Sequence, residues 1–321
     1  MSGPNTLTAT EIAHQIDGGK LTAEAVIRAH LERIDKRDAD VLAWSHLARD
    51  AALARARELD RGPRKGLLHG VPMGVKDIID SYDQPTTYGS PIYAKHQPLA
   101  DAATVALARD AGAILLGKTV TTEFANRHPG PTRNPHNPDH TPGGSSSGSA
   151  AAVADFQVTL ATGTQTGGSV IRPAAFCGVF GYKPTYAHFP TAGMKANTEW
   201  LDTIGCYARS LDDIALFRAA LMAIPYRPIE KVEAPPRIAV CFTPHKDELQ
   251  PEGLAARARA VCSSSIWVSG EASFQIGVPH RPMRGANRSL LIGTGGSLST
   301  APRNSAMSSI VRAMRPSVST E

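Results

Sequence analysis

Apolar residues in the first sixty positions recur with the spacing of amphipathic helices. The clearest such segment follows Thr22, a preferred helix-capping residue, and places four apolar side chains on one face. These side chains are Val26, Ile27, Leu31 and Ile34. A shorter helix capped by Thr10 is expected before it, and an Ala- and Arg-rich helix over 47–59 after it. We therefore expect residues 8–60 to be helical.

From Leu67 onward, short apolar segments with β-branched residues alternate with helical patterns. The segments that predict strands are 70–76, 113–116, 157–161 and 237–242. The patterns that predict helices are 101–110 with Asp101 as cap, 149–155, and 211–221 with Ser210 as cap. Residues 132–148 read as a loop rich in Pro, Asn, Gly and Ser. Helices that alternate with strands predict an α/β layer fold.

The patterning ends near Val261. Residues 262–321 contain thirteen serines and six arginines but no lysine, and their apolar residues follow neither a helical nor a strand period. We expect one domain over 1–261, with a catalytic core at 66–242, followed by an unrelated and irregular Ser/Arg-rich tail at 262–321.

Composition narrows the classes of function. The net charge is +5, but the tail supplies most of it, so the nearly neutral body does not resemble a nucleic-acid-binding surface. No apolar run is long enough for a membrane helix, and no signal peptide is evident. The four cysteines are widely spaced, which argues against structural zinc or a disulfide framework. We therefore expect a cytoplasmic protein without a membrane or nucleic-acid partner; a homo-oligomer stays open.

Two glycine-rich segments are candidates for chemistry. The segment 143–152, GGSSSGSAAA, contains Ser145; it is a flexible linker or a turn that fixes a hydroxyl. The segment 163–173, GTQTGGSVIRP, contains Ser169; it is an ordinary strand-to-helix turn or a place where backbone N–H groups bind an oxyanion.

Lys76 stands at the end of the predicted strand 70–76. A lysine in this position is usually exposed, with only its aliphatic stem covered. A buried lysine, in contrast, has its charged form destabilised and becomes a base near neutral pH. The residues alone leave both interpretations open.

The motifs together resemble the amidase-signature family. They are GVKD (74–77), GGSSSGSAAA (143–152), GTQTGGSVIRPAAFCG (163–178) and GYKPT (181–185). The run GTQTGGSVIRPAA is similar to the malonamidase-like branch, and the similarity covers about residues 8–260. The resemblance implies a mixed β-sheet covered on both faces by helices, and, because it stops near residue 260, a fold without its C-terminal part.

The resemblance also implies roles for individual residues. Ser169 matches the nucleophile, Ser145 the serine that relays its proton from a cis peptide, and Lys76 the base. The backbone N–H groups of Thr166, Gly167, Gly168 and Ser169 match the oxyanion hole, and Arg172 matches a substrate-binding arginine. The implied enzyme hydrolyses the C–N bond of a small linear carboxylic amide through an acyl-enzyme, without a metal or cofactor.

Three features bear on this interpretation. Gln165 replaces an Asp that is frequent in the family, which points to a subgroup. His136 and His140 have a spacing seen in zinc sites, but they lie in a Pro-containing loop without an evident third ligand. Cys177 has no evident His partner and is expected to be a packing residue.

Two other functions stay open. One is the amidase subunit of a glutamyl-tRNA amidotransferase, which releases ammonia from glutamine for a partner. The other is an inactive relative, because the abrupt change of residue usage near 261 is what an out-of-frame continuation of a GC-rich gene would produce. On that hypothesis the chain would be poorly soluble and weakly active, since a sheet without its last strands exposes apolar faces.

Overall fold

The computed structural model describes residues 3–230 and 251, together with four strands that follow residue 230. These four strands are β7 (Ile238–Val240), β8 (Ile266–Val268), β9 (Phe274–Ile276) and β10 (Ile292–Thr294). The helices are α1 (Ala9–Asp17), α2 (Ala23–Val41), α3 (Arg49–Arg61), α4 (Ala103–Asp110), α5 (Ser147–Ala154), α6 (Ile171–Cys177) and α7 (Leu211–Leu221). The main strands are β1 (Trp44–Leu47), β2 (Pro72–Lys76), β3 (Ile114–Thr119), β4 (Leu160–Gln165), β5 (Phe180–Tyr182) and β6 (Thr203–Ala208).

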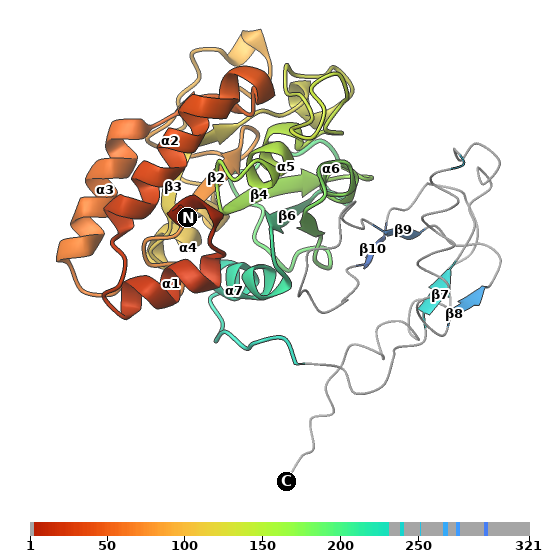
Figure 1. Ribbon diagram of the computed structural model, residues 1–321. Coiled ribbons are helices and arrows are strands. Elements are labelled where there is room, and N and C mark those ends of the chain that lie inside the picture. The colour runs from red at the N-terminus through yellow and green to blue at the C-terminus, as the bar shows by residue number, and fades with distance from the viewer. Residues whose placement is uncertain are drawn as a thin grey trace.

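A six-stranded mixed sheet organises residues 44–208, with the strand order β1-β3-β2-β4-β6-β5 (Figure 1). Strand β2 lies in the middle and pairs in parallel with both β3 and β4, whereas β1, β5 and β6 add antiparallel pairs. The carboxyl ends of β2 and β4 therefore meet at one edge of the sheet, and Lys76 and Gln165 end these two strands.

Helices cover both faces of this sheet. Leu115, Leu160 and Cys206 pack with residues of α1, α4 and α7. Their sequence neighbours Leu116, Ala161 and Tyr207 pack instead with residues of α2, α3, α5 and α6. Successive side chains of a strand point to opposite faces, so the two clusters are the two sides of one sheet. The predicted mixed α/β sheet is confirmed.

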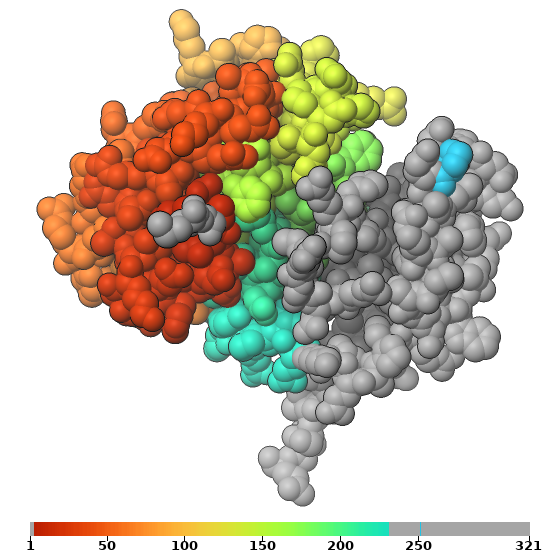
Figure 2. Space-filling model, viewed as in Figure 1, coloured from red at the N-terminus to blue at the C-terminus, as the bar shows by residue number. Residues whose placement is uncertain are grey.

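The helix α2 agrees with its pattern in detail. The Thr22 hydroxyl accepts a hydrogen bond from the Ala25 N–H, and all four predicted apolar residues are buried. In Figure 2, the red-orange to orange atoms of α2 and α3 form much of the molecular surface on one side of the view. The same capping logic holds for Ser210, whose hydroxyl accepts from the Asp213 N–H at the start of α7.

Two predicted caps are wrong. Helix α1 is capped by Thr8, which forms a reciprocal pair of hydrogen bonds with Glu11, while the Thr10 hydroxyl donates to Asp213 on α7. Helix α4 has Ala102 at its N-cap, because the Asp101 carboxylate accepts from the Tyr82 N–H and pairs with Arg109 instead. In both cases a distant partner competes with the local cap.

The fourth strand runs over 160–165, whereas the sequence pattern predicts it at 157–161. Its glycine at 163 is required by packing, because a Cβ there would lie 2.6 Å from the ring of Tyr207 on β6. A strand interior that contains glycine has a weak sequence signal. Because β4 extends to Gln165, Thr162 and Thr164 are strand residues and not part of the loop that the sequence predicts after 161.

The predicted tail at 262–321 lies outside the described residues, apart from strands β8, β9 and β10. Within the described part of the chain, no helix has the length and apolarity needed to cross a membrane.

Candidate active site

Lys76, the last residue of β2, is fully buried. Its Nζ lies 2.8 Å from the Ser145 hydroxyl and 2.7 Å from the Thr164 hydroxyl. Burial lowers the pKa of Lys76 well below its usual value, and the Asp202 carboxylate opposes this shift. Because a neutral amine has a lone pair, it can take a proton from a hydroxyl that contacts it. The lysine is thus a buried amine directed at Ser145, not a surface cation.

The sequence prediction missed Thr164 and Thr162, which hold this lysine from β4. Thr164 contacts the amine, and the Thr162 hydroxyl accepts from the Lys76 backbone N–H at 3.1 Å. Both threonines are completely or almost completely buried. Residues two apart on a strand face the same side of the sheet, and positions 162 and 164 fit this pattern. The predicted strand ended at 161, so the pattern became evident only once the strand was known to extend to Gln165.

The serine-rich segment before α5 contacts both the end of β4 and the turn that contains Ser169. The Gly144–Ser145 peptide bond is cis, and Ser145 is 3% exposed. Ser146 hydrogen-bonds with its hydroxyl to the backbone of Thr164, and its N–H donates to the Ser169 carbonyl at 3.4 Å. The segment is therefore a fixed turn, and it places Ser145 next to Lys76.

Ser169 lies between β4 and α6 and is partly exposed. Its carbonyl accepts from the buried Tyr207 hydroxyl at 3.2 Å. Among the described residues, no hydrogen bond joins the hydroxyls of Ser145 and Ser169. The structure brings the loops of the two serines together through backbone contacts, and brings only Ser145 into direct contact with Lys76.

Gln165 supports the turn that contains Ser169. Its side-chain oxygen accepts from the N–H groups of Val170 and Ile171, at 2.8 and 3.0 Å, and its amide nitrogen donates to the Gly167 carbonyl at 2.8 Å. An aspartate could make the accepting contacts but not the donating one. The departure from the family's frequent Asp is thus accommodated by an additional hydrogen bond.

The N–H groups of Gly167, Gly168 and Ser169 have no acceptor among the described residues. Gly167 is exposed, and a Cβ at this position would meet nothing within 4 Å. Three successive unpaired donors beside a partly exposed serine are the arrangement that a developing oxyanion needs. Thr166, the fourth predicted member, donates with its hydroxyl to the Asp202 carboxylate.

Arg172, the remaining predicted residue, is exposed on the first turn of α6. Its backbone N–H donates to the Gly168 carbonyl at 2.9 Å. The turn therefore fixes the backbone of Arg172, three residues beyond Ser169.

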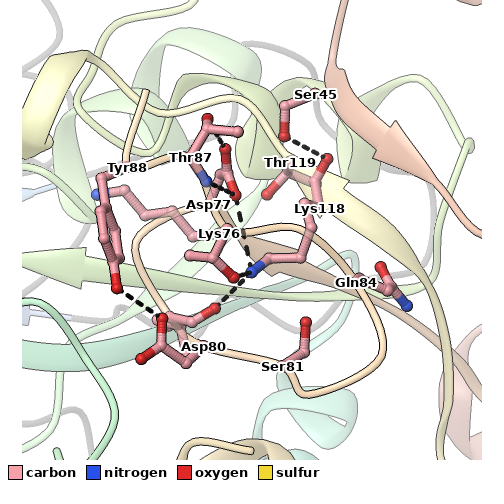
Figure 3. Close-up of polar contacts among 12 residues, drawn as sticks. Ser45, Lys76, Asp77, Asp80, Ser81, Gln84, Thr87, Tyr88, Lys118 and Thr119 are labelled. Atoms are coloured by element: carbon pink, nitrogen blue, oxygen red, sulfur yellow. Dashed lines mark hydrogen bonds and ion pairs between the residues drawn. The ribbon is translucent and has the colours of Figure 1, made fainter. Parts of the chain in front are cut away.

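Figure 3 shows a second group of buried polar side chains, which the sequence prediction also missed. Lys118 on β3 is fully buried and donates to the Ile79 carbonyl and the Thr86 hydroxyl, both at 2.6 Å. Burial lowers its pKa to about 8, and the neighbouring carboxylates, first that of Asp77, oppose this.

Asp77 follows Lys76 in sequence but is directed elsewhere. Its carboxylate lies 3.7 Å from the Lys118 amine and accepts from the N–H and hydroxyl of Thr87 (Figure 3). The charge of Asp77 is thus compensated by Lys118, and the catalytic candidate Lys76 is left with hydroxyl partners.

Two residues set aside in the sequence occupy structural positions. A ring nitrogen of His136 lies 2.8 Å from the Cys177 carbonyl. The Cys177 thiol is buried, which raises its pKa, and it contacts the Pro142 carbonyl. A raised pKa disfavours the thiolate, the nucleophilic form of cysteine.

The family model described as Amidase matches residues 25–259, which include all of these candidate residues. The chain belongs to the amidase family. A glutamyl-tRNA(Gln) amidotransferase subunit of Acidothermus cellulolyticus is 44% identical over 238 residues, 71% of this chain and 47% of that relative. The same subunit of Thermobifida fusca is 43% identical over 239 residues, 71% of this chain and 48% of that relative. The chain spans about half the length of the curated relatives it matches.

Solved amidase structures share the fold. A crystal structure described as an amidase has a TM-score of 0.75 at 31% identity and covers 82% of this chain and 63% of that one. The native peptide amidase of Stenotrophomonas maltophilia has a TM-score of 0.71 at 31% identity, covering 83% and 62% of the two chains. The family is thus shown, whereas the malonamidase-like branch is not, because the relatives at 39–44% identity are amidotransferase subunits.

Proposed function

We propose that this amidase-family chain hydrolyses a carboxamide through Ser169, Ser145 and Lys76. The observation that carries the proposal is the buried amine of Lys76, 2.8 Å from the Ser145 hydroxyl. A serine hydroxyl is a weak nucleophile until a neighbouring base takes its proton. Burial supplies that base by disfavouring the charged form of the lysine.

The proposed reaction has two halves. The Ser169 oxygen bonds to the amide carbon, and its proton passes through Ser145 to neutral Lys76. The N–H groups of Gly167, Gly168 and Ser169 stabilise the oxyanion. The C–N bond then breaks, the departing nitrogen receives the proton back through the relay, and ammonia leaves an acyl-enzyme. Water attacks this ester with the same groups as base, and releases the acid and Ser169.

The relay requires the hydroxyl of Ser169 to reach that of Ser145. Catalytic hydrogen bonds are often long or misaligned in an unliganded enzyme and become shorter with substrate. The loops of both serines are already linked by the hydrogen bond from the Ser146 N–H to the Ser169 carbonyl, which keeps the two loops together.

The names of the relatives favour glutamine as the amide, with its ammonia passed to a second protein of the same complex. A free-standing amidase for malonamate-like amides is the second candidate, and the exposed Arg172 beside Ser169 favours it. A guanidinium presents a planar pair of donors that matches a carboxylate. Either setting uses the same three catalytic side chains.

Ammonia release from a panel of glutamine, malonamate and neutral aliphatic amides would test the proposal. We expect release from at least one amide by the purified chain, and none by the Ser169→Ala variant. Release from glutamine that increases with a co-purifying partner protein supports the amidotransferase setting. Unchanged release by Ser169→Ala would contradict the proposed chemistry.

Arg172→Lys is expected to raise KM for amides that carry a carboxylate and to change kcat little. For an amide that carries a nearby carboxylate, we expect KM to rise about tenfold, because lysine cannot form the two-point contact. Neutral amides should be affected less. Steady-state kinetics on a matched pair, such as malonamate and propionamide, measure the difference. An equal rise for both amides would assign Arg172 to the support of the turn.

A further inference from the structure

Asp202, the residue immediately before β6, is 5% exposed and uses both carboxylate oxygens. One oxygen accepts from the Thr166 hydroxyl. The other accepts from the N–H groups of Asn197 and Thr198. A buried carboxylate with this many donors is held firmly in place. Asp202 thereby links the 197–202 turn to Thr166, the first residue of the turn 166–169, which we call the oxyanion turn.

The sheet explains why Asp202 and Thr166 meet. Strands β4 and β6 are antiparallel, and their last registered pair is Gln165 with Thr203. Asp202 and Thr166 are the next residues outward on the two strands, so they face each other at the strand ends. Gln165 hydrogen-bonds to residues further along the chain, from 167 to 171. Among the described residues, only Asp202 forms a hydrogen bond with the side chain of Thr166.

Asp202 also acts on the base. Its carboxylate favours the charged form of Lys76 and so moderates the decrease in pKa that burial causes. The elements packed around Lys76 otherwise present hydroxyls, from Ser145, Thr162 and Thr164. Asp77 and Lys118 compensate each other.

We propose that Asp202 is a positioning residue for amide hydrolysis, which holds Thr166 and with it the oxyanion turn. This inference rests on the proposed function. Loss of one oxyanion donor costs about 10²–10³-fold in kcat, and a misplacement of about 1 Å costs about 100-fold. A side-chain contact that orients the first residue of the turn should therefore affect kcat much more than KM.

Thr166→Val and Thr166→Ser form the matched test. Valine removes the hydroxyl with little change of shape and leaves the contacts of Asp202 with the 197–202 turn intact. We expect kcat for ammonia release to fall about 10–100-fold for valine, with KM nearly unchanged, and to recover with serine. Circular dichroism and thermal melting show whether each variant is folded. A folded valine variant with kcat within twofold of wild type would overturn the proposal.

Asp202→Asn provides an independent readout. Without the carboxylate, the charged form of Lys76 is less favoured, so the pKa of Lys76 decreases further. The acid limb of the kcat/KM profile should then move to lower pH. A purely structural role for Asp202 predicts a lower melting temperature with neither a lower kcat nor a moved acid limb, and that result would contradict our inference.

Labelling of Ser169 by a fluorophosphonate separates this inference from the proposed function, because phosphonylation needs the same turn but no amide. The labelling rate is followed by intact mass. If the wild-type chain is labelled but cleaves no amide, the proposed function fails, and slower labelling of Thr166→Val still supports the positioning role. Equal labelling of both proteins overturns that role alone. No labelling and no turnover would contradict both proposals.

Discussion

Replacement of Lys76 by methionine is expected to lower kcat by about 10⁴–10⁶-fold, as in other hydrolases that lose a member of their catalytic unit. Methionine has a similar length and fills the same space, but it cannot take the proton of Ser145. The fold should survive, because a buried amine that must be neutralised contributes little to stability. Ammonia release and a thermal melt measure the two effects separately.

Non-additivity is the sharper part of this expectation. If Lys76, Ser145 and Ser169 act as one unit, the double variant Lys76→Met/Ser145→Ala should be hardly slower than either single variant. Lys36→Met, an exposed lysine on α2, is the matched control and should retain full activity. A folded Lys76→Met variant within tenfold of wild-type kcat would contradict the assignment of the base.

The pH dependence follows from the same lysine. Burial lowers the pKa of Lys76, and only the neutral amine is a base. Activity should therefore fall as the pH is lowered through this depressed pKa and level off above it. A kcat/KM profile in a series of buffers shows the limb. An activity that rises toward acid pH would exclude a neutral lysine as the base.

The second large effect is expected on stability, at Arg209. Arg209 is 8% exposed, and its guanidinium donates to four backbone carbonyls, those of Asn5, Leu7, Val153 and Val158. It also lies over the Phe156 ring, 4.7 Å from the centroid. Burial lowers its pKa to about 10, so it remains charged at neutral pH. The hydrogen bonds of this one side chain thus join three parts of the chain: the N-terminal segment, the end of β6, and the last turn of α5 with the loop after it.

Arg209→Met should reduce the free energy of unfolding by about 3–5 kcal/mol, because it leaves buried carbonyls without donors. For a protein of this size, the melting temperature should fall by roughly 10 °C. Arg28→Met, which removes an exposed ion pair with Glu24, is the control and should leave the melting temperature nearly unchanged. An equal effect of both variants would show that the four carbonyls are satisfied in another way.

These two sites also show what the sequence could and could not predict. Ser145 and Ser169 lie in contiguous glycine-rich motifs and Lys76 in the short motif GVKD, so local pattern together with family resemblance selected them as candidates. Thr164 lies inside one of these motifs, but its contact with Lys76 could not be read from the motif. The contacts of Thr164, Asp202 and Arg209 depend on the register of β4 with β6 and on pairs far apart in the chain. Contacts between residues far apart in the chain cannot be read from local sequence patterns.

The wrong caps have the same origin. Thr10 and Asp101 are good capping residues by type, yet each bonds to a distant partner instead, Asp213 in one case and Tyr82 in the other. Helix positions were accurate because hydrophobic periodicity extends over many residues. Strand ends were less accurate, since glycine at 163 interrupts the pattern inside β4.

The separation of the contacting residues along the chain has a consequence for folding kinetics. Lys76 and Ser145 are 69 residues apart, Lys76 and Thr164 are 88 apart, and Arg209 reaches back 202 residues to Leu7. Such non-local pairs form slowly, because a long loop must close before any contact stabilises it. Helices α2 and α3 can form early, whereas Lys76 meets its hydroxyl partners only after β2 and β4 pair. In a refolding experiment, helical circular dichroism should therefore recover before phosphonylation of Ser169, and enzymatic competence would be among the last properties that the chain acquires.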